Sequence, residues 1–221
     1  MTRSYFSALN STLPAAEATG KMTLRPWSVV RSLTFDPTRK RISAVNVVDA
    51  QTGEELSYTA RVVFLCASAL ESARILLNSA SRDFPNGLAN SSDQVGRNLM
   101  FHPCVNVYGY GDERLDANHA PPLCLWSKEF YETDPARGFL RGYMMQFIRG
   151  TGPVTEAIQM ESKGLLPWGA DHHDEFRRRN GHRIGLNALC EDLPEAHNRV
   201  TLDPALRDSN GIPAPRIAVL G

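Results

Sequence analysis

The chain contains no Gly-x-Gly-x-x-Gly loop between a strand and a helix, the pattern that holds the pyrophosphate of a bound dinucleotide. Its nearest glycine groups, at residues 109–111 and 150–152, are partial matches that follow no suitable strand and helix. None of its four cysteines forms a Cys-x-x-Cys pair, which argues against a zinc ribbon and against a redox dithiol. No Ser/His/Asp or Cys/His catalytic signature stands out either.

An excess of charge and long apolar runs are also lacking. The formal net charge of zero argues against an electrostatic nucleic-acid surface. The longest apolar stretches fall far short of the roughly 20 residues that cross a bilayer, and residues 1–10 lack the apolar core of a secretory signal. With 221 residues, 42% hydrophobic and 22% charged, the chain has the composition of a soluble globular protein with one large domain or two small ones.

The cysteines, at positions 66, 104, 124 and 190, are widely scattered. We therefore expect structural thiols, as opposed to disulfides or catalytic groups. Cys66 ends an apolar run, so we expect it to be a small buried side chain. This cysteine usage fits a reducing compartment.

The first part of the chain alternates strand-like runs with turns. β-forming residues dominate 23–35, although Pro26 makes its start irregular, and apolar residues alternate in 42–48. A third strand-like run covers 58–65, and turn-forming residues separate the three runs. The pattern predicts a β-meander beside a parallel sheet.

The most informative stretch runs from Arg61 to Ser79. It predicts a buried strand, a turn of small residues at 67–69, and a helix with one buried face from Leu70 onward. An open α/β sheet uses such a unit to bring backbone N–H groups close to a nucleotide. A loop over 83–98, with one proline and two glycines, follows.

The composition changes near residue 100. Strand-like runs at 138–148 and 184–190 flank a charged helix predicted at 170–180. We expect residues 100–195 to be a second region, mostly sheet with one or two helices. Residues 196–221 are short strands, and the chain stops within a strand-like run without a cap or polar tail, which favours a truncated sequence.

Several blocks, in order, resemble the glucose–methanol–choline (GMC) flavoprotein oxidoreductases, above all the flavoprotein subunits of bacterial sugar, polyol and gluconate dehydrogenases. In the block that begins at residue 65, Ala73 and Ala80 stand where the family usually has Ser or Pro and then Gly. Alanine suits a helix at both positions. The resemblance covers essentially the whole chain, through residues 16–25, 65–79, 86–92, 95–103, 190–194, 198–204 and 211–213.

The resemblance implies an α/β (α+β) fold in three parts. Residues 1–99 would be a partial FAD-binding, Rossmann-like domain with the β-meander, and 100–195 a substrate-binding domain built on a mostly antiparallel sheet with helices. Residues 196–221 would return toward the FAD and substrate domains. The family's Gly-x-Gly-x-x-Gly, its ribose-binding acidic residue and its C-terminal catalytic His with a second His or Asn are missing, so the resemblance implies an interior piece of a GMC enzyme with no catalytic residue.

The resemblance also places four residues near FAD. Val30 matches a valine whose backbone contacts the adenine; the alternatives are a plain strand residue or a register that slips to Val29. Ala67, Ser68 and Ala69 match the turn beside the ribose and pyrophosphate, where small side chains let the backbone approach and the helix start favours an anion. The alternative for these three is tight packing between strand and helix.

Other reactive residues have plainer interpretations. Glu71 suits the first turn of a helix and can pair with Arg74, which predicts a local surface ion pair. His102 has the chemistry of a general base. In the family, however, this His-Pro marks the entry to the substrate region, and we expect a structural role.

Two further groups lie in the second region. His172 and His173 are adjacent in a predicted helix, so their side chains diverge, and a solvated face is expected instead of a metal site. The basic run 177–179 is expected to be a solvated helix end. Tyr143 and Met145 alternate on the clearest strand and either line a substrate pocket, as the resemblance implies, or belong to an ordinary core.

Two hypotheses for function follow. The first is a flavin-dependent enzyme that oxidises CH–OH groups of small alcohols, polyols or sugars, with hydride passing to FAD. The intact protein would be cytoplasmic or periplasmic, without nucleic acid or a membrane span, while this chain alone would be inactive and would retain FAD poorly. The second is a non-catalytic interaction module that folds with a partner chain. Neither the electron acceptor nor partner subunits can be read from the sequence.

Overall fold

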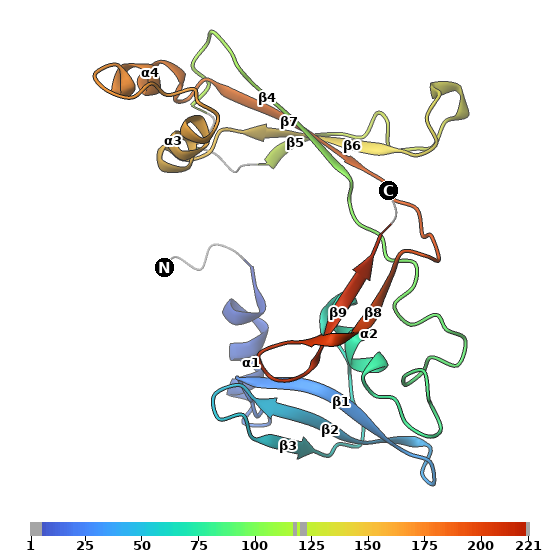
Figure 1. Ribbon diagram of the computed structural model, residues 1–221. Helices are drawn as coiled ribbons and strands as arrows, with labels where there is room; N and C mark the ends of the chain where they lie inside the picture. Colours follow the sequence, from blue (N-terminus) through green and yellow to red (C-terminus); the bar gives the residue numbers. More distant parts are fainter. Residues whose placement is uncertain (1–5, 117–118, 120–122, 220–221) are drawn as a thin grey trace. The chain divides into compact units, whose positions relative to one another are not determined.

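The computed structural model describes residues 6–116, 119 and 123–219, which form two compact units. The first unit comprises the residues up to 99 together with those from 196 onward, and the second comprises 100–195 (Figure 1). The fold is mixed α and β, and the sheets are antiparallel throughout the described ranges.

The first unit contains the predicted β-meander. Its three antiparallel strands lie in chain order: β1 (Ser28–Asp36), β2 (Arg41–Asp49) and β3 (Glu55–Tyr58). Asp36 and Asp49 close the two turns, because a side-chain oxygen of each accepts hydrogen bonds from backbone N–H groups two and three residues later. Turns therefore separate the three strands, as the sequence predicts.

The predicted helix is confirmed as α2 (Ser68–Leu77). It packs against β1 and against a hairpin of β8 (Arg199–Arg207) and β9 (Pro213–Ala218), as Figure 1 shows. A short 3-10 turn η1 (Ala8–Asn10) and α1 (Thr12–Ala18) precede the meander and bury no residue.

The core of the first unit lies between the meander and α2. Leu33 of β1, Ile75 of α2 and Leu88 of the following loop form its buried centre. Partly buried side chains surround them, and among these Phe35 meets Phe84 edge to face at 4.9 Å between ring centroids. The loop over 83–98 is thus part of the hydrophobic core through Phe84 and Leu88.

The predicted strand over 58–65 is wrong beyond Tyr58, where β3 ends. Residues 61–66 belong to no strand and pair with none among the described residues. Val63 and Leu65 pack on the core, whereas Val62 and Phe64 are 66% and 85% exposed. Alternation of apolar side chains predicts one buried face, but only a neighbouring strand can bury the other, and the described ranges supply none.

The same missing neighbour explains two related corrections. The parallel sheet expected beside the meander does not occur in the part of the chain that the structure describes. Cys66, expected to be buried, is exposed, because it follows Phe64 and Leu65 on the uncovered segment. Cys104 is also exposed and Cys190 is half-buried; these three are free thiols, and the side chain of Cys124 is outside what the structure describes.

The second unit is built on one antiparallel sheet. Its strands lie in the order β4-β7-β6-β5, with bounds β4 (Cys104–Tyr110), β5 (Leu123–Ser127), β6 (Tyr143–Arg149) and β7 (Arg183–Cys190). The strand predicted at 138–148 begins five residues later, after the 3-10 turn η3 (Pro135–Arg137) and the left-handed Gly138. The strand predicted at 184–190 is confirmed as β7.

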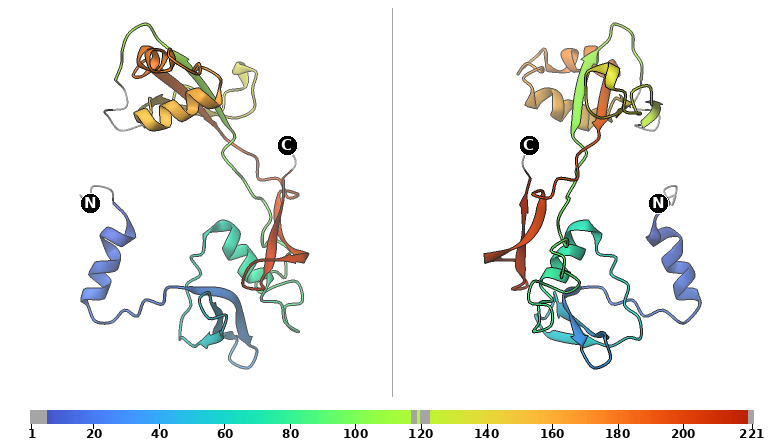
Figure 2. Two further views of the ribbon diagram at one scale, coloured as in Figure 1. Left: turned by 60° about the vertical axis from the view of Figure 1, so that its left-hand side comes forward. Right: turned by 90° about the vertical axis from the view of Figure 1, so that its right-hand side faces the viewer.

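Two helices connect β6 to β7. They are α3 (Pro153–Ser162) and α4 (His172–Arg179), and Figure 2 shows them next to each other at one end of the sheet. The helix predicted at 170–180 is confirmed as α4. α3 was not predicted, although Gly152 and Pro153 at its start and the buried pair Glu156 and Met160 one turn apart are its sequence signals.

Candidate cofactor-facing turn and ligand cavity

The turn that leads into α2 exposes small side chains at the start of a helix. Ala67 packs against the core, whereas Ser68 and Ala69, the first two residues of α2, are exposed. No side chain of the preceding residue caps the first N–H groups of this ten-residue helix. Their partial positive charge therefore faces outward between small residues, as an anion requires.

Ser68 holds this turn in an uncommon backbone conformation. Its φ of 73° lies in the left-handed region, which costs a non-glycine residue about 1–2 kcal/mol. The surrounding packing must compensate for that strain, since Ala67 directly before it belongs to the core. The position of the turn is thus fixed from one side by the core and left open on the other.

Val30 lies on β1 where the pairing with β2 shifts register, and its side chain packs against the same core as Ala67. The adjacent edge of β1 is fastened to the end of α2. The carbonyl of Arg31 accepts a hydrogen bond from Asn78 Nδ2 at 2.8 Å, and the N–H of Leu33 donates to Ser79 Oγ at 2.8 Å. The structure therefore brings Val30 and Ala67 to one cluster and leaves Ser68 and Ala69 at its exposed margin.

The predicted pair of Glu71 and Arg74 is present, with 3.3 Å between Oε2 and NH1. Its predicted surface position is wrong, because Arg74 is buried. Arg74 NH2 donates to Asp208 Oδ2 at 2.7 Å, and Arg74 Nε donates to the carbonyl of Pro213 at 2.8 Å. An arginine can satisfy several acceptors at once, and this one ties α2 to the β8–β9 turn.

The ionisation of Asp208 reflects that contact. Burial opposes its charge, but hydrogen bonds from Arg74 and from the N–H groups of Ile212 and Asn210 outweigh burial, so its pKa lies below the ordinary value. The carboxylate is therefore charged at neutral pH and holds the hairpin turn.

The second unit contains a cavity of about 550 Å³ at the end of β6 and β7. A volume in the range of about 300–1,000 Å³ is typical of sites for small molecules. Its walls combine carboxylates, hydroxyls, an imidazole, an amide and apolar side chains. The lining residues are His102, Tyr131, Glu132, Thr133, Gly142, Tyr143, Met144, Gln146, Leu189, Cys190 and Glu191.

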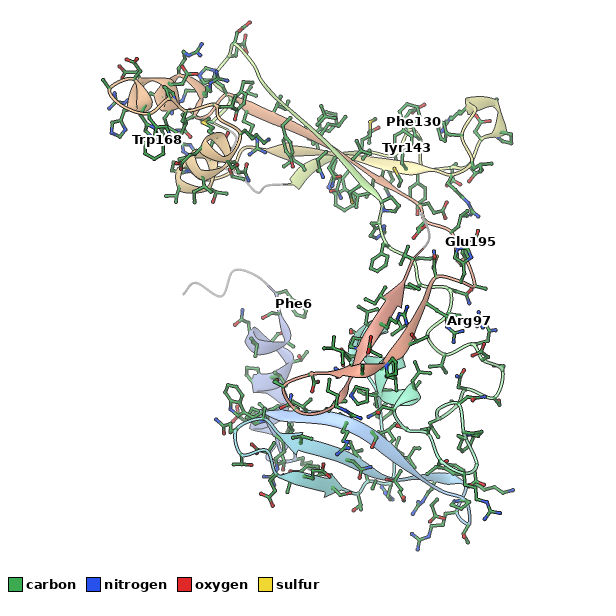
Figure 3. The ribbon with its side chains drawn as sticks, viewed as in Figure 1. Phe6, Arg97, Phe130, Tyr143, Trp168 and Glu195 are labelled. Atoms are coloured by element: carbon green, nitrogen blue, oxygen red, sulfur yellow. The ribbon has the colours of Figure 1, made fainter. Side chains whose placement is uncertain are left out.

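Aromatic packing and one close backbone approach fix the cavity wall. The Tyr143 ring stacks on Phe130 at 5.0 Å and lies 5.6 Å from Phe139, and Figure 3 shows Tyr143 and Phe130 together. A Cβ at Gly142 would lie 1.8 Å from the carbonyl oxygen of Tyr131, so only glycine fits here. The N–H of Tyr143 donates to the carbonyl of Phe130 at 2.8 Å, which holds the two segments together.

Three amides form a row across the sheet, and one of them, Gln146, lines the cavity. Asn106 of β4 pairs with Asn187 of β7, which pairs with Gln146 of β6. Asn187 Nδ2 donates to Gln146 Oε1 at 3.4 Å. Asn187 Oδ1 is buried and has no hydrogen-bond partner among the described residues.

Tyr143 and Met145 of β6 differ in their position relative to the cavity. Tyr143 lines the cavity, while Met145, which is half-buried, is not among the lining residues. His102, expected to be structural, is exposed and lines the cavity. Glu132, Gln146 and Glu191 also line the cavity and were not predicted from the sequence, because they come from three separate segments that only the fold brings together.

A buried ionic cluster fastens α3 to the sheet at its other end. Glu156, 1% exposed, accepts hydrogen bonds from Tyr110 at 3.1 Å, Thr151 at 2.9 Å and Arg183 at 2.9 Å. Arg183 also stacks on the Tyr108 ring, 4.1 Å from its centroid. Burial, with the nearby Glu156 charge, raises the pKa of Tyr110 above its ordinary value, so this phenol remains a donor.

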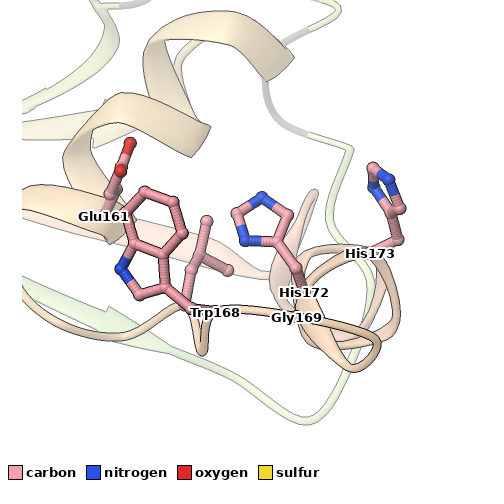
Figure 4. Close-up of a pocket in the computed structure, with 6 residues that line it drawn as sticks. Glu161, Trp168, Gly169, His172 and His173 are labelled. Atoms are coloured by element: carbon pink, nitrogen blue, oxygen red, sulfur yellow. The ribbon is translucent and has the colours of Figure 1, made fainter.

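A smaller hollow of about 280 Å³ lies between α3 and α4. Figure 4 shows the Trp168 indole, 89% exposed, between the Glu161 carboxylate and the His172 ring. The His172 and His173 rings are perpendicular at 5.5 Å, and His172 Nδ1 lies 3.1 Å from the carbonyl of Pro167. No group of three or more His, Cys, Asp or Glu side chains that could hold a metal ion occurs among the described residues.

The basic run at the end of α4 is engaged with acidic side chains of the same helix. Arg177 pairs with Asp174, while Arg178 and Arg179 both pair with Glu175. None of the helices in the described ranges is long and apolar enough to cross a membrane.

Comparison with known proteins matches the first part of the chain to one family. Residues 3–104 match the family model of the GMC oxidoreductases. A 2-methyl-1,2-propanediol dehydrogenase of Mycolicibacterium austroafricanum is 36% identical over 182 residues, which cover 80% of this chain and 32% of that protein.

Two further relatives match over a similar extent. The fructose dehydrogenase large subunit of Gluconobacter japonicus is 28% identical, over 87% of this chain and 34% of that protein. A 6'''-hydroxyparomomycin C oxidase of Streptomyces lividus is 29% identical, over 84% of this chain and 31% of that protein. The chain thus spans about a third of the length of the curated relatives it matches.

Proposed function

This chain belongs to the GMC oxidoreductase family, and we propose that it serves the FAD-dependent oxidation of CH–OH groups in sugars, polyols or related alcohols. The observation that carries the proposal is the set of relatives that match 80% to 87% of the chain. Each is a dehydrogenase or oxidase named for a hydroxylated compound. We further propose that the first unit is the cofactor side and the second unit the substrate side.

The residues of the first unit fit an FAD. Ser68 and Ala69 would hold the pyrophosphate side, because their exposed small side chains let an anion reach the N–H groups of the first turn of α2. Val30, on the edge of β1 near Ala67, would contact the adenine through its backbone. When bound, FAD supplies the electron sink that accepts hydride from the alcohol carbon.

The second unit would hold the alcohol. Tyr143 and its neighbours form a wall that aromatic stacking keeps rigid, which favours a defined orientation of the CH–OH group. The hydroxyl proton must pass to a base as the carbonyl forms. We assign that role to none of the described residues and propose that this chain alone is inactive and binds FAD weakly.

Flavin bleaching tests the function directly. The full-length gene product, purified with its flavin, is mixed without oxygen with glucose, a short 1,2-diol, and 1-deoxyglucose lacking the anomeric hydroxyl. Loss of the oxidised flavin absorbance with at least one alcohol supports the proposal, and the deoxy sugar identifies the reacting carbon. A product that contains no flavin, or a flavin that stays oxidised with every alcohol, overturns it.

A second candidate is an interaction module that folds with a partner chain, and the exposed Val62 and Phe64 favour it. It predicts a flavin-free protein whose Phe64→Ser variant is released from its partner. Copurification of flavin with the full-length product, unaffected by Phe64→Ser, would reject the module and retain the enzyme.

A further inference from the structure

The cavity of the second unit has an apolar wall that suits one face of a ring. Met144 and Leu189 lie opposite each other on β6 and β7, and both line the cavity beside Tyr143. The C–H faces of sugar rings pack against such surfaces, because burying apolar area is favourable even when the ligand is rich in hydroxyls. The volume, about 550 Å³, exceeds what a short diol fills.

Gln146 adds a hydrogen-bonding group at the floor. The residue is only 9% exposed, and its Oε1 accepts from Asn187, which leaves Nε2 without an acceptor among the described residues. If both amides exchange oxygen and nitrogen, the bond between them persists and Gln146 then offers its oxygen. A ligand hydroxyl both donates and accepts, so it satisfies either orientation.

Two carboxylates, those of Glu132 and Glu191, give the cavity a negative charge. Glu132 has no ion-pair partner within the described ranges, and Glu191 faces only Arg141, at 3.9 Å. His102 is the lining residue that can carry a positive charge. The carboxylates accept hydrogen bonds from hydroxyl and ammonium groups, while they repel a ligand carboxylate.

From these three features we infer that the cavity binds a neutral or cationic polyhydroxylated ring, a sugar or amino sugar, and rejects sugar acids. The inference rests on the proposed function for its relevance to catalysis and deepens it by naming the substrate class. Gln146 orients the ring through its hydroxyls, and Glu132 with Glu191 determine the charge that is accepted.

The test is a flavin-independent binding measurement on the purified chain. Glucose, glucosamine and gluconate are titrated separately, and binding is followed by the NMR signals of the aromatic side chains, with calorimetry for affinity. We expect saturable binding of glucose and glucosamine and at least about tenfold weaker binding of gluconate, because two like charges oppose it.

Variants assign the effect to the cavity. The Glu132→Gln and Glu191→Gln double variant should lose about tenfold of the preference for glucosamine over gluconate, while Glu129→Gln, exposed and outside the lining, should leave it unchanged. Gln146→Leu should weaken the binding of all three sugars. An amide NMR spectrum that is unchanged away from the cavity shows that this variant folds.

The sugar-binding test and the flavin-bleaching test decide separate claims. No binding of any sugar, equal binding of gluconate, or an unchanged preference in the double variant overturns the cavity assignment, whatever the flavin does. Failure of flavin bleaching with intact sugar binding overturns the proposed function and leaves the cavity assignment standing.

Discussion

At the residue scale, single side chains fasten the elements within each unit to one another. Ser79 shows this at residue scale, since its Oγ accepts from the N–H of Leu33 at 2.8 Å and donates to the carbonyl of Ile75 at 2.6 Å. Both bonds are buried and link β1 to α2. One hydroxyl therefore fastens the C-terminal end of α2 to the strand that carries Val30.

Removing that hydroxyl should destabilise the first unit. In Ser79→Ala the buried N–H of Leu33 loses its acceptor, which costs about 1–3 kcal/mol. Urea denaturation should show a lower midpoint with an unchanged slope. Ser91→Ala, at an exposed position, is the control and should keep the wild-type midpoint; equal midpoints for the two variants would contradict the proposed role of Ser79.

The buried carboxylate of Glu156 has the corresponding role in the second unit. Glu156→Ala leaves Arg183 as a buried charge without its partner, and breaking a buried pair costs about 3–5 kcal/mol. We expect a large loss of thermal stability from this change. Glu161→Ala, an exposed glutamate of the same helix, should change it little, and a comparable loss in both variants would show that the contacts of Glu156 are not responsible.

At the scale of elements, α4 carries an unusual carboxylate. Hydrogen bonds from Arg178 and Arg179 lower the pKa of Glu175 to about 2. Because the folded pKa is depressed, this group's stabilising contribution is present above the ordinary glutamate range and is lost as pH falls toward 2.

An NMR titration of the Glu175 side-chain carboxyl tests this assignment. The carboxyl should remain ionised down to about pH 2. In the Arg178→Gln, Arg179→Gln double variant its pKa should rise toward the ordinary value, whereas Arg177→Gln, whose partner is Asp174, should leave it in place. A Glu175 pKa in the ordinary range in the unaltered protein would refute the contacts.

Elements with local signals were predictable from the sequence, and those that depend on distant partners were not. The turns of the meander follow from their turn-forming residues, α2 and β7 from apolar patterns, and α4 from a run of charged residues, all within a few positions. Residues 61–66 have the same alternation as a strand but no pairing neighbour in the part of the chain that the structure describes, so the prediction failed there. The buried role of Arg74 was missed because two of its acceptors, on Asp208 and Pro213, lie more than a hundred residues away.

The candidate site likewise has one part that local sequence predicts and one part that it does not. The turn at Ala67–Ala69 is local, and small residues before an apolar helix indicate it directly. The cavity of the second unit is not local: Glu132, Gln146 and Glu191 meet only because β6 pairs with β7 and the segment at 131–133 folds back through Gly142. A single sequence holds no signal for that meeting.

At the scale of the whole molecule, we propose that the two compact units are separate domains, with boundaries near residues 99 and 195. Separate cores predict separate responses to mutation. Ser79→Ala should lower the unfolding midpoint reported by backbone amides of the first unit alone, and Glu156→Ala that of the second alone. Hydrogen exchange under increasing urea resolves the two, and a shift of both units by either variant would contradict independent domains.

The central claim is that the start of α2 faces the flavin cofactor. The most direct test is FAD binding by Ala69→Glu compared with Ala80→Glu in the full-length product. Glutamate suits the first turn of a helix, as Glu71 already does, so folding is preserved while a phosphate is repelled. We predict a loss of FAD affinity of at least about tenfold for Ala69→Glu and wild-type affinity for Ala80→Glu, which adds the same charge at an exposed site beyond the helix. Equal FAD affinity in the two variants would contradict the account.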